Sequence, residues 1–213
     1  MHTTDLVIVG AAGHASDVIG LVEDLVADGA RWNLIGLVAD QPPPVPARFA
    51  GRAEFLGGLE KLAGLRAHVV VAAGYPRPRS GLVARIAPHI RHYATLVHPD
   101  AHLGTGSTVG AGTVILGGTR LSPKVTVGDH CYISHMVGIG HDAILSSFVS
   151  IMPAVSVSGD TRLGEGTLVG SNATVLEGIQ LGDWAVVGAG AVVTRDVAPG
   201  STVTGIPARD RTG

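Results

Sequence analysis

Residues 97–121 read VHPDAHLGTGSTVGAGTVILGGTRL, and an aliphatic residue returns at every sixth position of this stretch. The phase continues without a break to residue 193. The aliphatic positions are Val97, Leu103, Val109, Ile115, Leu121, Val127, Ile133, Ile139, Leu145, Ile151, Val157, Leu163, Val169, Val175, Leu181, Val187 and Val193. A period of six fits neither a helix nor an ordinary strand. It predicts one short strand and one turn per repeat, stacked as a parallel β-helix.

A second row of residues supports this prediction. Every residue four positions after an anchor is small or β-branched, which suits the tight corner of a narrow prism. Glycine directly follows many anchors, for example at Gly104 and Gly140, and we expect these glycines to adopt turn conformations with positive φ. Three hexads make one triangular coil, so residues 18 apart in the sequence should stack on one face.

The composition narrows the classes of partner. The chain has 213 residues, 46% of them hydrophobic and 15% charged, with a net charge of −2 and no basic run. Nucleic acid and anionic membranes are therefore poor candidate partners. The single cysteine, Cys131, excludes an internal disulfide framework and fits a reducing, cytoplasmic location. We expect Cys131 to be a buried structural thiol, and we find neither a signal peptide nor a membrane-spanning stretch.

The hexad pattern is absent before about residue 95, where strands alternate with helices. We expect strands at 6–9, 34–38 and 68–73, a helix after the turn at 10–14, a surface loop at 41–46, and a short helix at 80–89. The sequence thus predicts a small βαβ-type, Rossmann-like α/β domain over residues 1–95. The β-helix follows over residues 96–213, with a capping tail from about Arg195.

Three places in the sequence carry residues suited to chemistry or binding. The turn Gly10-Ala-Ala-Gly-His14 opens a helix whose free N–H groups can bind an anion such as phosphate, although a plain βα turn has the same composition. Asp40 ends a strand and can accept a hydrogen bond from a ribose or sugar hydroxyl, or cap a turn. His141, followed by Asp142, can act as a general base whose tautomer the carboxylate fixes.

Two further histidines, His130 and His135, lie close to His141 in the sequence. Three imidazoles raise the alternative of a metal site of the γ-carbonic-anhydrase kind. We interpret His130 and His135 individually as solvated turn residues, and we expect no metal, because no upstream ligand at a suitable stacking position is evident.

Several segments together resemble a known group. They are the turn at residues 9–14, Leu96-Val-His-Pro-Asp-Ala101, Gly140-His-Asp142 followed by Phe148, Val186–Val193, and Gly205-Ile-Pro-Ala-Arg209. The chain resembles left-handed β-helix (hexapeptide-repeat) acetyltransferases with a fused N-terminal nucleotide-sugar-binding domain. Within them it is similar to the sialic-acid O-acetyltransferase-like family, which includes 4-amino-sugar N-acetyltransferases of the PglD and perosamine type.

The resemblance implies a role for particular residues. His141 would be the catalytic base, Asp142 its orienting partner, and the Gly159 N–H would face the thioester carbonyl. Other residues would bind the two substrates: Ser171, Gly188, Ala189 and Arg209 for acetyl-CoA, and Ala12, Gly13, His14 and Asp40 for the nucleotide or sugar. Ser150 occupies the place of a cofactor-contacting histidine of the relatives, and Ser134-His135 replaces an Asn-Thr pair that touches the sugar.

We therefore expect an acetyltransferase that moves the acetyl group of acetyl-CoA to the amine of a nucleotide-linked amino-deoxy sugar, working as a homotrimer. O-acetylation of a sugar or of sialic acid is the alternative on the same scaffold, because one base can serve a hydroxyl or an amine. A metal-dependent hydratase and a purely structural β-helix are the alternatives from other classes.

Overall fold

The computed structural model describes residues 3–42 and 52–211. The N-terminal part holds a four-stranded parallel sheet of order β3-β2-β1-β4. Its elements are β1 (Thr4–Val9), α1 (Gly13–Ala27), β2 (Trp32–Val38), β3 (Phe55–Gly57), the 3-10 helix η2 (Leu59–Gly64), β4 (His68–Val71), α2 (Pro76–Ile86) and the 3-10 helix η3 (Ala87–His89). The three predicted strands are confirmed, whereas β3 and η2 were not predicted. Residues 43–46 of the predicted loop lie outside the described residues.

Helix α2 begins four residues earlier than the sequence predicted. Pro76 occupies the first turn of α2, where a missing N–H costs nothing and the fixed φ suits a helix. The proline therefore starts this helix ahead of the predicted start at residue 80. The end of the predicted helix near Pro88 is confirmed, because α2 stops at Ile86 and a 3-10 turn follows.

The anchor residues each end a two-residue strand, as the hexads predicted. The strands are β5 (Leu96–Val97), β6 (His102–Leu103), β7 (Thr108–Val109), β8 (Val114–Ile115), β9 (Arg120–Leu121), β10 (Thr126–Val127), β11 (Tyr132–Ile133), β12 (Gly138–Ile139), β13 (Ile144–Leu145), β14 (Ser150–Ile151), β15 (Ser156–Val157), β16 (Arg162–Leu163), β17 (Leu168–Val169), β18 (Thr174–Val175), β19 (Gln180–Leu181), β20 (Val186–Val187) and β21 (Val192–Val193).

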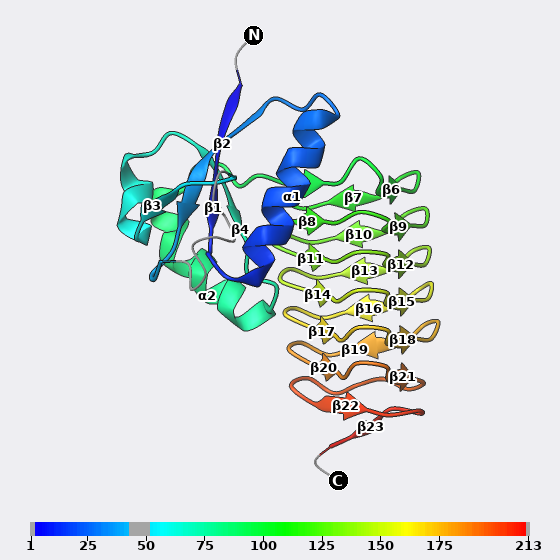
Figure 1. The fold of residues 1–213 in the computed structure, drawn as a ribbon. Helices are drawn as coiled ribbons and strands as arrows, with labels where there is room; N and C mark the ends of the chain where they lie inside the picture. The colour runs from blue at the N-terminus through cyan, green and yellow to red at the C-terminus, as the bar shows by residue number, and fades with distance from the viewer. Residues whose placement is uncertain (1–2, 43–51, 212–213) are drawn as a thin grey trace.

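Parallel pairing joins residues 18 apart, for example Thr126 with Ile144, so three hexads form one coil. The strands build three faces of a prism (Figure 1). Each face takes every third strand of the series. The first face includes β5, β8, β11, β14, β17 and β20. The second consists of β6, β9, β12, β15, β18 and β21, and the third of β7, β10, β13, β16 and β19. Most anchors and the small residues between them fill the prism as one apolar core, whereas the anchor Leu103 is 38% exposed.

The predicted role of the glycines after the anchors is wrong. Positive φ occurs three residues after an anchor instead, at glycines such as Gly106 and also at Asp142 and Asp160. Gly104 and Gly140 keep negative or extended φ, and a Cβ built on either would overlap the backbone of the next coil. These glycines are therefore required by the close stacking of coils rather than by a left-handed backbone.

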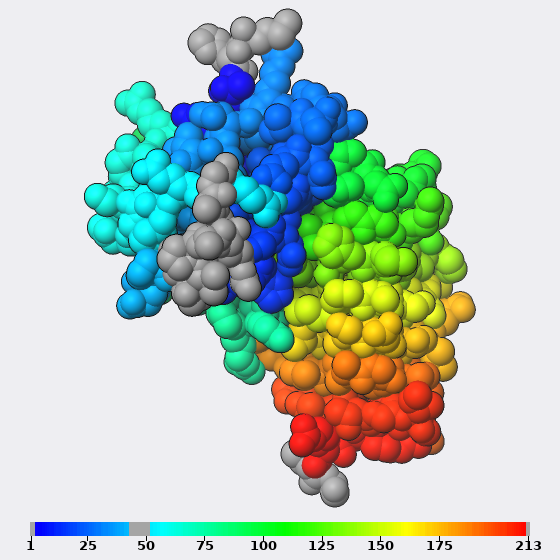
Figure 2. Space-filling view, in the orientation of Figure 1, coloured from blue at the N-terminus to red at the C-terminus, as the bar shows by residue number. Residues whose placement is uncertain are grey.

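The N-terminal part packs on the first face of the prism. Helix α1 buries Ala15, Val18 and Ile19 in a cluster that also contains Val114 and Tyr132 of the coils. Figure 1 shows α1 lying between the sheet and the coils, and Figure 2 shows the C-terminal coils standing clear of the N-terminal part. The apolar docking face thus lies on the earlier coils, and Arg77 of α2 also reaches a later coil, with its guanidinium carbon 4.9 Å from the centroid of the Trp184 ring.

The chain ends in a short hairpin, β22 (Thr202–Thr204) and β23 (Arg209–Asp210). Strand β22 extends the first face by pairing in parallel with β20, and β23 pairs with β22 antiparallel. The hairpin thus ends the parallel stack, as the predicted cap should. Across the described residues no helix combines the length and the apolar character needed to cross a membrane.

Candidate active site

His141 lies on an exposed corner of the prism, two residues after the end of β12. Its Nδ1 lies 3.0 Å from Oδ2 of Asp142, and both side chains are about half exposed, at 55% and 46%. Asp142 adopts a left-handed backbone with φ of 58°. The contact leaves Nε2 of the imidazole free of Asp142, so a neutral ring that donates through Nδ1 presents its lone pair at Nε2.

Gly159 stacks on His141 in the next coil. A Cβ built on Gly159 would lie 2.8 Å from both Cε1 and Nε2 of His141, so the imidazole fills the space that a side chain would need. Among the described residues the Gly159 N–H donates no hydrogen bond, while its carbonyl accepts one of 3.0 Å from the Gly178 N–H. The free edge of the imidazole and an unused backbone donor therefore lie side by side.

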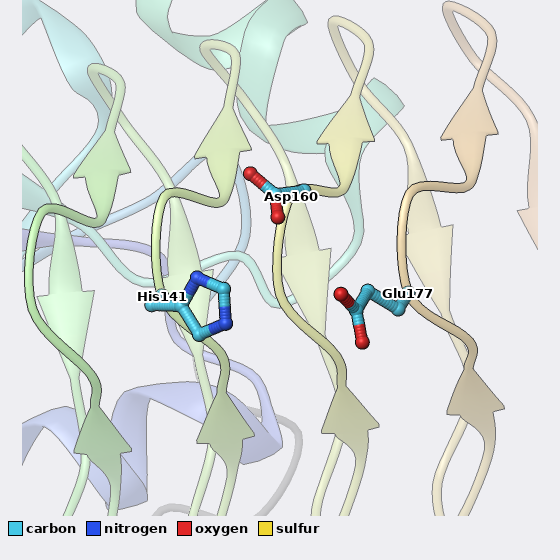
Figure 3. A group of neighbouring side chains, drawn as sticks. All are labelled: His141, Asp160 and Glu177. Carbon is cyan, nitrogen blue, oxygen red and sulfur yellow. The ribbon is translucent and has the colours of Figure 1, made fainter.

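Two carboxylates that the sequence analysis missed surround the imidazole. Asp160 and Glu177 offer carboxylate oxygens that lie, with a ring nitrogen of His141, all within 4.8 Å of one another. Figure 3 shows the three side chains around one gap on successive coils. The 18-residue period contains the missing signal, because Glu177 is two coils beyond His141 and Asp160 is one coil beyond Asp142. We call the set His141, Asp142, Gly159, Asp160 and Glu177 the His141 corner.

The structure can also be compared with the predictions for His130, His135 and Cys131. His135 is exposed, as predicted, but the solvated placement predicted for His130 is wrong. His130 is 8% exposed, because its ring stacks on Phe148 and meets Tyr93 edge-on. Burial lowers the pKa of His130 and raises that of Cys131 to about 12, so Cys131 is the buried, unreactive thiol that was predicted.

Three of the residues assigned to acetyl-CoA by resemblance, Ser171, Gly188 and Ala189, lie at a different corner. Ser171 and Ala189 follow β17 and β20, and the Gly190 N–H donates to the Ser171 carbonyl at 2.8 Å. We call this the Ser171 corner, and Gly188 adjoins it. The second face of the prism, from β6 to β21, separates it from the His141 corner within one chain. The two sets of residues therefore do not meet in a single subunit.

Two arginines lie at the C-terminal end of the prism. A hollow of about 280 Å³ is lined by Arg195, Val203 and Arg209, among other residues. Arg195 follows β21 as Glu177 follows β18, so the column that begins at His141 ends at this hollow, which Arg209 also lines. Arg195 was not among the predicted site residues.

Ser150 is fully buried between the N-terminal part and the coils. Its Oγ donates to the Gly74 carbonyl at 2.7 Å and accepts from Nη2 of Arg79 at 2.8 Å. Ser150 therefore has both hydroxyl roles satisfied inside the chain, away from the exposed corners.

The turn between β1 and α1 has the features of an anion site. Helix α1 begins at Gly13, its N-terminus has no side-chain cap, and Ala12 and Gly13 are exposed. His14 follows in the first turn, and its half-buried ring lies edge-on to Tyr75 and Tyr132, at centroid distances of 5.9 and 5.2 Å. Desolvation lowers the pKa of His14, so its imidazole is neutral at pH 7.

The carboxylate of Asp40 already forms a salt bridge with Arg85. Both carboxylate oxygens accept hydrogen bonds of 2.7 Å from Arg85 of α2, and both side chains are exposed. The hydrogen bonds from Arg85 lower the pKa of Asp40. A sugar hydroxyl would therefore have to share this carboxylate with Arg85.

Comparisons with known proteins agree with this geometry. Residues 160–195 match the model of the hexapeptide repeat of succinyl-transferase. The acetyltransferase domain of PglB from Neisseria gonorrhoeae, solved with acetyl coenzyme A, superimposes with a TM-score of 0.89 at 26% identity, covering 98% of this chain and 99% of that one. The chain is similar to hexapeptide-repeat acetyltransferases over nearly its whole length. Its prism is accordingly a left-handed β-helix.

Two further similarities add detail. PerB from Caulobacter crescentus, solved with CoA and GDP-perosamine, superimposes with a TM-score of 0.86 at 27% identity, covering 97% of each chain. The serine acetyltransferase of Escherichia coli K12 is 33% identical over 99 residues, which are 42% of this chain and 36% of that protein. The chain thus spans little more than a third of that curated relative.

Proposed function

We propose that this protein transfers the acetyl group of acetyl-CoA to the amine of a nucleotide-linked amino-deoxy sugar. The observation that carries the proposal is the length of the structural similarity. The PglB domain and PerB match over 97–99% of the chains compared, including the N-terminal α/β part, whereas the match to serine acetyltransferase covers 42% of this chain. An N-terminal part beside the coils favours a sugar nucleotide over a small amino acid.

The His141 corner supports direct transfer. The amine nitrogen attacks the thioester carbon, its proton passes to Nε2 of His141, and the C–S bond breaks to release CoA, whose sulfur takes up the proton. Asp142 holds Nδ1 and stabilises the imidazolium, and the unused Gly159 N–H is the proposed donor to the developing oxyanion. No acyl-enzyme is expected, since Cys131 is buried with a raised pKa.

The two substrates are assigned to different parts of the chain. We propose that residues 1–95 form a Rossmann-like domain that binds the nucleotide sugar through Ala12, Gly13, His14 and Asp40. Residues 96–213 would bind acetyl-CoA along the column from His141 toward Arg195 and Arg209. Three coils separate His141 from Arg195, or about 14 Å at the spacing of β-strands, and two arginines suit phosphate groups at the far end.

The two-corner arrangement also supports a homotrimer. Ser171, Gly188 and Ala189 lie across a prism face from His141 within one chain. In an assembly of three prisms the Ser171 corner of one subunit can face the His141 corner of the next. Acetyl-CoA bound between subunits would then contact both sets of residues.

A panel of acceptors tests the function. Purified protein is assayed for thiol release from acetyl-CoA with GDP-perosamine, with UDP- and dTDP-linked 4-amino sugars, and with L-serine. Turnover with an amino sugar nucleotide supports the proposal. Turnover with serine or with a 4-hydroxyl sugar nucleotide alone would favour O-acetylation, the second candidate, which the serine acetyltransferase similarity supports.

The base is tested in the same assay. His141→Ala should lower kcat by roughly 10²–10⁴-fold, the usual worth of a general base, with little change in KM. Asp142→Asn should lower it less. His102→Ala, which alters an exposed histidine on β6, is the matched control and should leave kcat unchanged.

A further inference from the structure

Arg79 of α2 is a buried cation that joins the N-terminal part to the coils. Only 1% of the residue is exposed, and burial lowers the pKa of its guanidinium to about 10, so it remains charged at neutral pH. Among the described residues, its hydrogen-bond partners are neutral groups. They are the carbonyls of His130 (2.6 Å), Ala73 (2.6 Å), Gly74 (3.0 Å), Phe148 (2.8 Å) and Val149 (3.1 Å), and Ser150 Oγ (2.8 Å).

One of these carbonyls, that of Gly74, also accepts a hydrogen bond from Ser150. The Gly74 carbonyl accepts from Nη1 of Arg79 at 3.0 Å and from Oγ of Ser150 at 2.7 Å. Ser150 in turn accepts from Nη2 of Arg79. Gly74, Arg79 and Ser150 therefore form a closed triangle of hydrogen bonds, which we call the Gly74 clamp. All three residues are buried.

The Gly74 clamp lies directly against His14. A Cβ built on Gly74 would overlap the His14 ring, with Nε2 as the nearest atom. Tyr75 and Tyr132 meet the same ring edge-on. His14 is thus wedged between the turn after β4 and the coils, and its position depends on where the clamp holds Gly74.

We propose that Ser150 and Arg79 are positioning residues for the sugar-nucleotide site, because they fix Gly74 and thereby hold His14 in place. The assignment of His14 to the sugar nucleotide rests on the proposed function. Ser150 then serves the acceptor substrate, whereas the resemblance assigned it to acetyl-CoA. The two assignments of Ser150 make opposite kinetic predictions.

The surroundings of His14 supply a readout that needs no substrate. Burial is the main cause of its lowered pKa; the Asp17 carboxylate of α1 opposes the shift and the Arg79 guanidinium adds to it. Tyr75 and Tyr132 complete the contacts around the ring. If Gly74 is released and water reaches the ring, desolvation weakens and the His14 pKa rises toward its ordinary value.

The test is Ser150→Ala in the full-length protein. It removes one donor and one acceptor from the clamp and adds no atoms. We expect KM for the amino sugar nucleotide to rise by roughly tenfold, which corresponds to one or two lost hydrogen bonds. KM for acetyl-CoA should stay within about twofold, and NMR titration of the His14 ring, assigned with His14→Gln, should show a raised pKa.

Thr167→Val is the matched control. Thr167 is equally buried, and its hydroxyl contacts the carbonyls of Gly164 and Gly182 within the coils only. Its loss should change neither KM nor the His14 titration. Arg79→Lys, which keeps the charge but loses the planar fork, should reproduce the Ser150→Ala pattern with a larger change.

The outcomes separate this proposal from the proposed function. A rise in KM for acetyl-CoA alone, or a His14 titration identical in wild type and Ser150→Ala, would overturn the positioning role. If wild type acetylates no amino sugar nucleotide, the proposed function fails, and the His14 titration still decides whether the clamp holds the ring. If Arg79→Lys does not fold, Ser150→Ala carries the test.

Discussion

Replacing Gly159 by alanine should displace the base without removing it. The new Cβ would lie 2.8 Å from Cε1 and Nε2 of His141, whereas ordinary contacts begin at 3.4 Å. The imidazole must therefore retreat by at least about 0.6 Å. His141 is exposed, so the ring can move without disturbing the core, and Gly159 has no positive φ that alanine would strain.

The size of the effect follows from that displacement. A misplacement of about 1 Å costs roughly 10²-fold in rate, so Gly159→Ala should lower kcat by about 10- to 100-fold. The backbone N–H of residue 159 is retained, which separates displacement of the base from loss of the proposed oxyanion donor. Thermal unfolding should not shift downward, because alanine reduces the entropy of the unfolded chain.

The assay is steady-state thiol release with the acceptor identified by the panel, for wild type, Gly159→Ala, His141→Ala and the double variant. The double variant should be no slower than His141→Ala, because the alanine acts only through the imidazole. Gly138→Ala is the matched control, since a Cβ there meets nothing within 4 Å. A Gly159→Ala enzyme with near-normal kcat, or one whose loss adds fully to that of His141→Ala, would refute the reasoning.

Four further outcomes are expected. Gly13→Val should raise KM for the amino sugar nucleotide but not for acetyl-CoA, and equal rises in both would contradict the assignment of that turn. Deletion after Gly205, or Arg209→Ala, should weaken CoA binding in calorimetry without altering the circular dichroism of the coils. Sedimentation equilibrium should give a trimer at micromolar concentration, and a monomer would argue against a site between prisms. Metal analysis should find no stoichiometric zinc, and EDTA should leave turnover unchanged; one zinc per chain would instead assign His141, Asp160 and Glu177 as ligands.

The stability of the protein should also depend on pH. Burial lowers the pKa of His130 in the folded chain, so between that pKa and about 6.5 the unfolded chain binds more protons. The free energy of unfolding should therefore fall as pH drops below about 6.5. His130→Asn, a residue that tolerates the φ of 53° found there, should reduce this slope in denaturant titrations at pH 7.5 and 5.5.

The coils were predictable because each repeat obeys the same local rule. The hexad phase alone located every strand from β5 to β21, since anchors must point inward wherever the prism continues. The glycines were misinterpreted because the sequence does not distinguish a residue that needs positive φ from one that must lack a Cβ. At Gly140 the second reason holds, and at Asp142 a non-glycine residue adopts positive φ.

The site was predictable only in part, for a related reason. His141 and Asp142 are adjacent in sequence, so their pairing needed no knowledge of the stack. Asp160 and Glu177 become neighbours of His141 only when the 18-residue period is applied to side chains as well as to the backbone. His130 was misplaced because its burial depends on Tyr93, which belongs to the N-terminal part, and no hexad rule describes that contact.

The triangular coil also limits how the length of this protein can change. Six residues added between His141 and Arg195 would turn everything beyond them by a third of a revolution, so Arg195 would leave the column that begins at the imidazole. Eighteen residues would keep every corner aligned and lengthen the prism by about 4.8 Å. Whole coils are therefore the natural unit for changing the distance between the His141 corner and the two arginines. An engineered insertion of 18 residues would test how strictly the length of acetyl-CoA sets that distance.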